Sequence, residues 1–213
     1  MVYFKDRVEA GKKLSTLLSK YKGKEAVVYA LPRGGVVLAE EIANFLEVPL
    51  DLLFAHKLGH PYQPEYAVAA ISESGHVVGN AYELQSLGKE WLDREKERQL
   101  AGIQNRRKLY LQDRPEIPIK DKIAIIVDDG IATGLTMQAG ILELRDKHPL
   151  KIIVAVPVSP KSAAEAIKAL ADDFIAIEVP EDGKFRGSVG SYYQLFDQVE
   201  NSEVISILKK RRG

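Results

Sequence analysis

The most informative stretch of the chain is IAIIVDDGIATGLT, residues 123–136. Five apolar residues of strand length come first, two adjacent acids follow, and a turn containing glycine and threonine then opens a helical pattern. In an open α/β fold, ligands bind at the carboxyl ends of the parallel strands. The stretch therefore predicts that Asp128 and Asp129 stand at such an edge, beside a helix N-terminus.

Each part of this stretch has a chemical use. The carboxylates of Asp128 and Asp129 can accept hydrogen bonds from vicinal hydroxyls. The turn over residues 131–136 directs backbone N–H groups, with the hydroxyls of Thr133 and Thr136, at one spot that suits a phosphate. The alternative is that the acids only cap the helix and the glycines only permit the turn. A cap needs one acid, so two acids beside such a turn favour a site for sugar hydroxyls and a phosphate.

Strand and helix patterns alternate outward from this stretch. Strands are expected over residues 26–31, 50–55, 123–127, 151–156 and 174–179, and helices over 6–21, 36–46, 135–147, 162–172 and 203–210. This alternation predicts an α/β fold, a doubly wound and mostly parallel sheet flanked by helices. Shorter strands over 67–71 and 77–78 are separated by Ser74 and Gly75, which suits a hairpin.

Composition limits the possible classes of protein. The chain has 213 residues, which predicts one domain over 1–213, with a core over about 24–160 and a C-terminal accessory segment over about 173–200 plus the last helix. There is no cysteine, which excludes disulfides, thiolate nucleophiles and cysteine-bound metals. A net charge of zero argues against nucleic-acid and membrane partners. With no signal sequence visible, a cytoplasmic location is expected.

The residues quoted so far carry a resemblance to a known family. Residues 123–136 resemble the phosphoribosyl-pyrophosphate signature of type I phosphoribosyltransferases, and the whole chain resembles a poorly characterised bacterial and archaeal group of them. The resemblance implies that Asp128 and Asp129 are catalytic and hold the ribose 2′- and 3′-hydroxyls. It also implies a substrate-binding loop for the ribose and 5′-phosphate made of Gly130, Ile131, Ala132, Thr133, Gly134, Leu135 and Thr136.

The LPRGG turn at residues 31–35 resembles the family's pyrophosphate loop. Gly34 and Gly35 let the backbone approach a ligand closely, and Arg33 offers a forked donor for phosphate oxygens. The alternative is a tight turn with a solvent-facing arginine. Lys57 ends the expected second strand at the same edge and could bind pyrophosphate, although an exposed lysine at a strand end needs no explanation.

Residues 173–196 resemble the hood of hypoxanthine-type purine phosphoribosyltransferases, with Phe185 matching the aromatic that stacks on the base. The alternative for Phe185 is a core aromatic of that segment. A purine-like acceptor is therefore favoured, while the identity of the base stays open. His56 and His60 cannot form a helical metal pair because Gly59 and Pro61 break a helix, so no metal site made by the protein alone is expected.

The segment over 89–112 is charged on most faces and reads as a solvated helix or a mobile loop. It is the candidate lid, supplying arginine or lysine to the leaving group. The resemblance implies transfer of ribose 5-phosphate from phosphoribosyl pyrophosphate to a nitrogenous base, with Mg²⁺ bound alongside the substrate and pyrophosphate released. Two alternatives stay open: a regulatory or sensor protein that only binds phosphoribosyl pyrophosphate, and a phosphorolytic or hydrolytic enzyme. A homodimer is the expected assembly.

Overall fold

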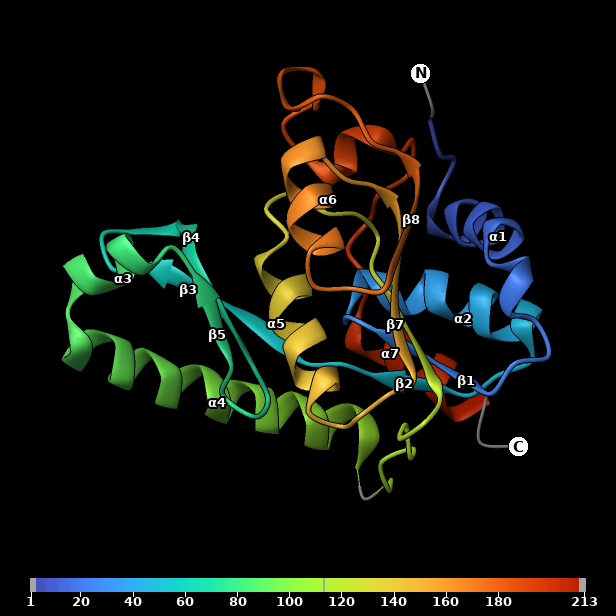
Figure 1. The fold of residues 1–213 in the computed structure, drawn as a ribbon, viewed down its shortest axis with the longest axis horizontal. Coiled ribbons are helices and arrows are strands. Elements are labelled where there is room, and N and C mark those ends of the chain that lie inside the picture. The colour runs from blue at the N-terminus through green and yellow to red at the C-terminus, as the bar shows by residue number, and fades with distance from the viewer. Residues whose placement is uncertain (1–2, 113, 211–213) are drawn as a thin grey trace.

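A five-stranded parallel sheet forms the centre of the molecule (Figure 1). The computed structural model describes residues 3–112 and 114–210, so the expected domain over 1–213 includes six residues outside the described part. The strand order is β2 (Leu50–Leu52), β1 (Ala26–Ala30), β6 (Ile123–Val127), β7 (Lys151–Val158) and β8 (Asp173–Glu178). Every neighbouring pair is parallel, which confirms the expected doubly wound α/β fold.

Helices cover both faces of this sheet. One face carries α5 (Leu135–Arg145) and α6 (Lys161–Lys168), and the other carries α1 (Arg7–Leu17) and α2 (Gly34–Leu46) (Figure 1). Alternate residues of β6 divide between the two sides: Ile125 packs with the α1 and α2 core, and Ile126 packs with the α5 and α6 core. Because both faces are buried, β6 reads as a continuous apolar run rather than an alternating one.

The first and last helices both pack against α2. Asp6 caps α1 by accepting a hydrogen bond from the Glu9 amide at 2.8 Å, which confirms the expected opening helix; a short 3₁₀ turn, η1 (Ser19–Tyr21), follows it. The last helix, α7 (Asn201–Lys210), packs against α2. The segment over 179–200, here called the hood, contains η2 (Asp182–Lys184) and η3 (Val189–Tyr192). The strand that precedes it, β8, belongs to the main sheet.

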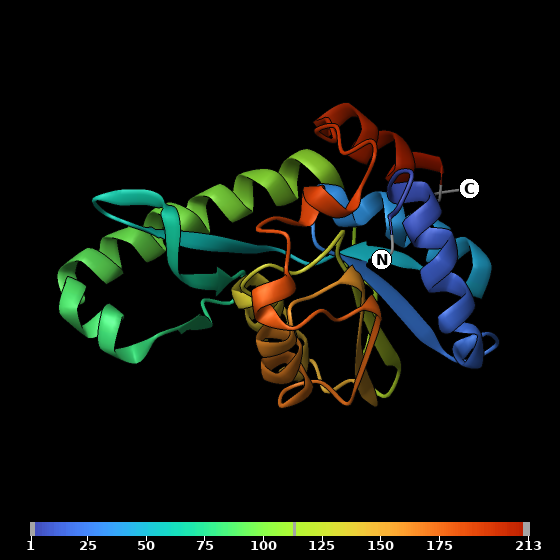
Figure 2. The same ribbon diagram turned by 90° about the horizontal axis from the view of Figure 1, so that it is seen from above.

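A second, antiparallel sheet projects from the main body (Figures 1 and 2). It is made of β3 (Ala55–His60), β4 (Gln63–Ser72) and β5 (Val77–Gly79), followed by α3 (Ala81–Leu87) and α4 (Lys89–Leu111), and residues 55–111 are called the arm below. The pairing of β4 with β5 confirms the hairpin expected over 67–71 and 77–78.

The expectation of a single strand over 50–55 was wrong, because this run is divided between the main sheet and the arm. Only β2 pairs in the main sheet, and the chain then crosses to β3 through Leu53 and Phe54. Lys57 therefore belongs to the arm and does not end a strand of the parallel sheet. The run LDLLFA is apolar almost throughout, so periodicity could not show where one strand stops and the next begins.

The charged segment over 89–112 is a helix rather than a loop. Its buried residues, Ile103, Tyr110 and Leu111, all lie in the second half of α4, which packs on β3 and α7. The first half has no buried residue. In the described part of the chain, no helix combines the length and the apolar character that crossing a membrane requires.

A buried carboxylate fastens the arm to the main body. Glu143 on α5 accepts hydrogen bonds from the Ser72 hydroxyl at 2.8 Å, the Ser74 amide at 2.8 Å and the Ser74 hydroxyl at 2.7 Å. Burial alone would raise the pKa of Glu143, but the hydrogen bonds from Ser74 and Ser72, with the charge of Lys147, outweigh burial and lower this pKa. The turn between β4 and β5 is therefore held by charge-assisted hydrogen bonds.

We predict that Glu143→Gln lowers the free energy of unfolding by about 1–3 kcal/mol at pH 7, because an amide cannot accept all three bonds. A lowered carboxyl pKa stabilises the fold above the ordinary glutamate pKa, and this contribution is lost as pH falls through the lowered value. The difference between parent and variant should therefore shrink below about pH 4. Urea denaturation at several pH values measures it, with the exposed Glu65→Gln as control; equal stabilities at pH 7 would refute the role of this carboxylate.

Candidate active site

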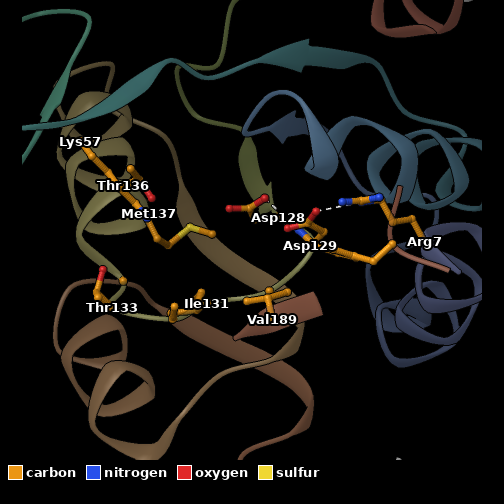
Figure 3. Close-up of a pocket in the computed structure, with 13 residues that line it drawn as sticks. Arg7, Lys57, Asp128, Asp129, Ile131, Thr133, Thr136, Met137 and Val189 are labelled. Carbon is orange, nitrogen blue, oxygen red and sulfur yellow. Dashed lines mark hydrogen bonds and ion pairs between the residues drawn. The ribbon is translucent and has the colours of Figure 1, made fainter. Parts of the chain in front are cut away.

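The acid pair and the loop that follows it line one pocket at the carboxyl end of β6 (Figure 3). The pocket has a volume of about 320 Å³. It is lined by Arg7, Lys57, Asp128, Asp129, Gly130, Ile131, Ala132, Thr133, Gly134, Thr136, Met137, Val189 and Phe196. Eight of the nine residues expected to bind ribose and phosphate, all except Leu135, are therefore brought together, and Lys57 reaches the same pocket from the arm.

The loop after the acids ends where α5 begins. Gly134 caps this helix with a φ of 79°, and Leu135 is its first residue. Figure 3 shows Thr133 and Thr136 on the side of the pocket opposite Arg7, with the acid pair between them. A helix N-terminus with free amides and nearby hydroxyls attracts an anion. This end of the pocket can therefore receive a phosphate, and the other end presents carboxylates.

The PRGG turn packs directly against the acid pair. A Cβ atom at Gly34 would lie 1.9 Å from Asp129 Oδ2, and one at Gly35 would lie 2.7 Å from the Val127 carbonyl oxygen. No side chain fits at either position, so the glycines are required by this close approach. The Pro32–Arg33 peptide bond in this turn is cis.

Arg33 and Phe185 do not reach this pocket. Arg33 lines a separate pocket, together with residues of α4 and α7. The Phe185 ring packs 5.5 Å from the ring of Tyr192, in the contact expected of a core aromatic of the hood. The aromatic side chain that does line the acid-pair pocket is Phe196.

Burial shifts the titration of both acids. Burial, and then the negative charge of Asp129, raise the pKa of Asp128 well above its ordinary value, although the Asp129 amide donates a hydrogen bond to Asp128 Oδ1 at 2.8 Å. Burial also raises the pKa of Asp129, and the charge of Arg7 opposes that rise. Without a ligand, the simultaneous ionisation of both acids is therefore unfavourable.

Arg7 lines the pocket and contacts the acid pair, and sequence reasoning missed it. Its Nε donates to Asp129 Oδ2 at 2.8 Å, one terminal nitrogen donates to the Asp197 carbonyl oxygen at 2.7 Å, and its guanidinium carbon lies 3.8 Å from the centre of the Phe196 ring. Its side chain is only 12% exposed, so the ion pair is shielded from water. Tyr193 adds a hydrogen bond to the Asp129 carbonyl oxygen at 2.6 Å. The start of α1 and the hood thus meet on Asp129.

The sequence matches a known protein family and known relatives. Residues 7–194 match the family described as the phosphoribosyl transferase domain. The chain is 37% identical over 212 residues to proteins of Mycobacterium tuberculosis, strains CDC 1551 and H37Rv, that are provisionally named phosphoribosyl transferases; the match covers 99% of this chain and 47% of each of theirs. The chain thus spans about half the length of the curated relatives it matches.

Solved structures agree with this match. The crystal structure of TT1426 from Thermus thermophilus superposes with a TM-score of 0.81 at 37% identity and covers 98% of both chains. AQ2163 from Aquifex aeolicus, at 12% identity and a TM-score of 0.52 over 82% of this chain and 75% of its own, shares the fold. The chain belongs to the phosphoribosyl transferase family, which confirms the resemblance drawn from residues 123–136.

We predict that Asp128→Asn makes the ligand-free protein more stable at pH 8, by about 1–3 kcal/mol, because it removes a partly buried charge and keeps the Oδ1 acceptor. A raised carboxyl pKa means that the folded state holds its proton more tightly than the unfolded state does. The parent should therefore lose stability as pH rises from the ordinary aspartate pKa, about 4, through the raised folded value.

Thermal and urea unfolding at pH 5 and pH 8 measure this effect, with the exposed Asp93→Asn as the matched charge change. The gap between parent and Asp128→Asn should widen at pH 8, whereas Asp93→Asn should follow the parent. If Asp128→Asn is the less stable protein at pH 8, the acid serves the fold as a cap instead.

Proposed function

We propose that the protein binds phosphoribosyl pyrophosphate together with Mg²⁺ and transfers ribose 5-phosphate to a nitrogenous base, with release of pyrophosphate and with a purine-like acceptor favoured. The observation that carries this proposal is the convergence of two carboxylates and a phosphate-suited loop in one pocket. A ligand that has vicinal hydroxyls and a phosphate on one sugar could contact both groups. Membership of the phosphoribosyl transferase family supports the same reaction class.

In this proposal, each part of the pocket holds one part of the substrate. The loop at the start of α5 binds the 5′-phosphate through its amides and the hydroxyls of Thr133 and Thr136. Asp128 and Asp129 accept hydrogen bonds from the ribose hydroxyls. As the acceptor nitrogen bonds to ribose C1 and the bond from C1 to the pyrophosphate oxygen breaks, positive charge develops on the sugar. Carboxylates beside the ring stabilise that charge.

The same geometry gives roles to the side chains at the rim. Lys57 reaches the pocket from β3 and offers an ammonium group to pyrophosphate oxygens. Ile131, Met137, Val189 and Phe196 form the apolar lining that a planar base would contact. Phe196 therefore takes the place that the sequence assigned to Phe185. Arg7 holds the second acid in position, since it bridges Asp129 and the hood.

The donor set suits a Mg²⁺ ion that is shared with the substrate. Among the described residues, no group of three or more histidine or acidic side chains could hold a metal ion. Mg²⁺ usually binds one or two carboxylates and completes its shell with water and substrate phosphates, and the adjacent acids offer such a pair. Mg²⁺ would supply positive charge that neutralises the pyrophosphate group. A homodimer and a cytoplasmic location stay predictions.

Calorimetric titration with phosphoribosyl pyrophosphate, with and without Mg²⁺, tests the site. We expect binding that depends on Mg²⁺ and that weakens about 10- to 100-fold in Asp128→Asn and in Asp129→Asn, because each variant loses charge-assisted hydrogen bonds to the ribose. Asp93→Asn should bind like the parent. If all three variants bind with equal affinity, the acid pair does not contact the ligand.

A product assay separates the reaction from its alternatives. Release of pyrophosphate that requires one base from a panel, with formation of the matching nucleotide, supports a transferase. Release without any base indicates a hydrolase. Mg²⁺-dependent binding with no turnover indicates a protein that only senses the substrate.

We also predict that α4 responds to the ligand. Its first half has no buried residue, so its amides should exchange with solvent faster than those around Ile103 and Tyr110. Adding phosphoribosyl pyrophosphate and Mg²⁺ should slow that exchange if the helix closes over the site, since new contacts must outweigh the entropy lost on ordering. Hydrogen exchange with mass spectrometry measures it. Full protection without ligand, unchanged on its addition, would make α4 scaffold rather than lid.

A further inference from the structure

A histidine of the arm is packed between β3 and α4. The helix runs along the arm and back to the main body (Figures 1 and 2). Four of its residues, spaced three or four apart, share one face: Glu95, Gln99, Gly102 and Arg106. His56 Nδ1 lies 3.1 Å from Gln99 Oε1, and a Cβ atom added at Gly102 would lie 3.4 Å from His56 Cε1. The imidazole ring of His56 therefore packs directly on this face of the helix.

The hydrogen bonds of Gln99 fix the position of the proton on His56. Gln99 Nε2 donates to Glu95 Oε1 at 2.8 Å, so this side-chain amide turns its oxygen toward the ring. An amide oxygen only accepts hydrogen bonds, and His56 Nδ1 must therefore carry a proton. In the neutral ring Nε2 is then bare. This atom is buried, and it has no hydrogen-bond partner among the described residues.

Protonation of His56 would place a second N–H group and a positive charge at this position. The new donor on Nε2 would have no acceptor in the part of the chain that the structure describes, and it would be buried. Burial, and then the charge of Arg106, lower the pKa of His56, although the contact with Gln99 opposes them. The packed arrangement therefore favours the neutral ring.

Within the described chain, no carboxylate compensates a charge on this ring. In β4, the residue that pairs with the histidine is the apolar Ile71. Helix α5, which also packs on β3, has two charged residues, Glu143 and Arg145, and both bind groups outside β3. On α4, Glu95 already accepts two hydrogen bonds from Arg98. An imidazolium ion would therefore be unfavourable as long as α4 stays packed on β3.

We propose that His56 is a pH-sensitive contact between β3 and α4: the neutral ring holds the first half of the helix on the arm through Gln99, and the protonated ring releases it. No residue of α4 before Ile103 is fully buried, so the attachment of residues 89–102 depends on partly buried side chains and on this contact. Because β3 also carries Lys57, which lines the acid-pair pocket, the contact links the order of α4 to the strand that reaches this pocket.

The sign of the pH dependence follows from the direction of the pKa shift. The folded state lowers the pKa of His56, so the packed arrangement is fully stable above the ordinary histidine pKa of about 6.5. It loses stability as pH falls from that value to the lowered one. Mild acid should therefore loosen the first half of α4.

Hydrogen exchange with mass spectrometry on the full chain without ligand, at pH 5 and pH 7.5, tests the contact. In the parent, protection factors over residues 89–102 should fall at pH 5, by up to about tenfold for each unit by which packing lowers the pKa of His56. His56→Asn keeps an N–H donor at the δ position and does not titrate, so its protection should be equal at both pH values. His60→Asn, on the same strand, is the matched control and should behave like the parent.

NMR titration of the imidazole resonances adds a measurement that does not depend on opening of the helix. Single substitution of each of the four histidines assigns the signals. We expect His56 to carry its proton on Nδ1 at pH 7.5 and to titrate with a pKa below about 6.5.

The pH dependence should disappear in His56→Asn and persist in His60→Asn. The proposal is overturned if residues 89–102 of the parent keep their protection at pH 5, if His56→Asn loses protection as the parent does, or if His56 titrates at or above the ordinary pKa. None of these measurements uses phosphoribosyl pyrophosphate, so a negative result would leave the proposed transferase function intact.

Discussion

Two adjacent carboxylates in a poorly solvated pocket are the constraint around which the rest of the protein is arranged. Their mutual repulsion and partial burial disfavour ionisation, and the fold compensates one of them by bringing Arg7 to 2.8 Å from Asp129. The glycines of the PRGG turn exist because nothing larger fits beside these acids. Arg7 neutralises only part of the negative charge of the acid pair. A ligand that donates hydrogen bonds from hydroxyl groups and brings a cation would neutralise the rest.

Most of the parallel sheet could be predicted because its strands are short apolar runs followed by recognisable turns. The run IAIIV is followed by two acids, and AVVYA is followed closely by a proline and glycines, so the residues after each strand mark its end. The break between β2 and β3 could not be predicted, because Leu53 and Phe54 are as apolar as the strands they join. Local pattern reports burial and does not report which of two sheets a strand enters.

The same distinction applies to the site. The residues of 128–136 are contiguous, so their convergence follows from one strand, one turn and one helix. Arg7, Tyr193 and Phe196 come from the two ends of the chain, and an arginine in the first turn of a helix looks like any solvated residue. No motif singled out Arg7. Its segment contributed only to the resemblance of the whole chain to the family. Phe185 and Phe196 are both aromatic residues of the hood, and only packing tells which of them faces the pocket.

The contact between the two ends of the chain has a consequence for how the molecule forms. The backbone of Phe4 pairs with the hood through two hydrogen bonds. The Phe4 amide donates to the Tyr192 carbonyl oxygen at 2.9 Å, and the Gln194 amide donates to the Phe4 carbonyl oxygen at 2.8 Å. The bond from Arg7 to Asp197 spans 190 residues of sequence. Contacts this distant close the longest loops and form slowly, so the sheet can assemble before the hood docks. A newly made chain would then pass through a stage in which the acids are already placed but Asp129 lacks its cation, and the arrival of the last segment completes the charge balance of the site.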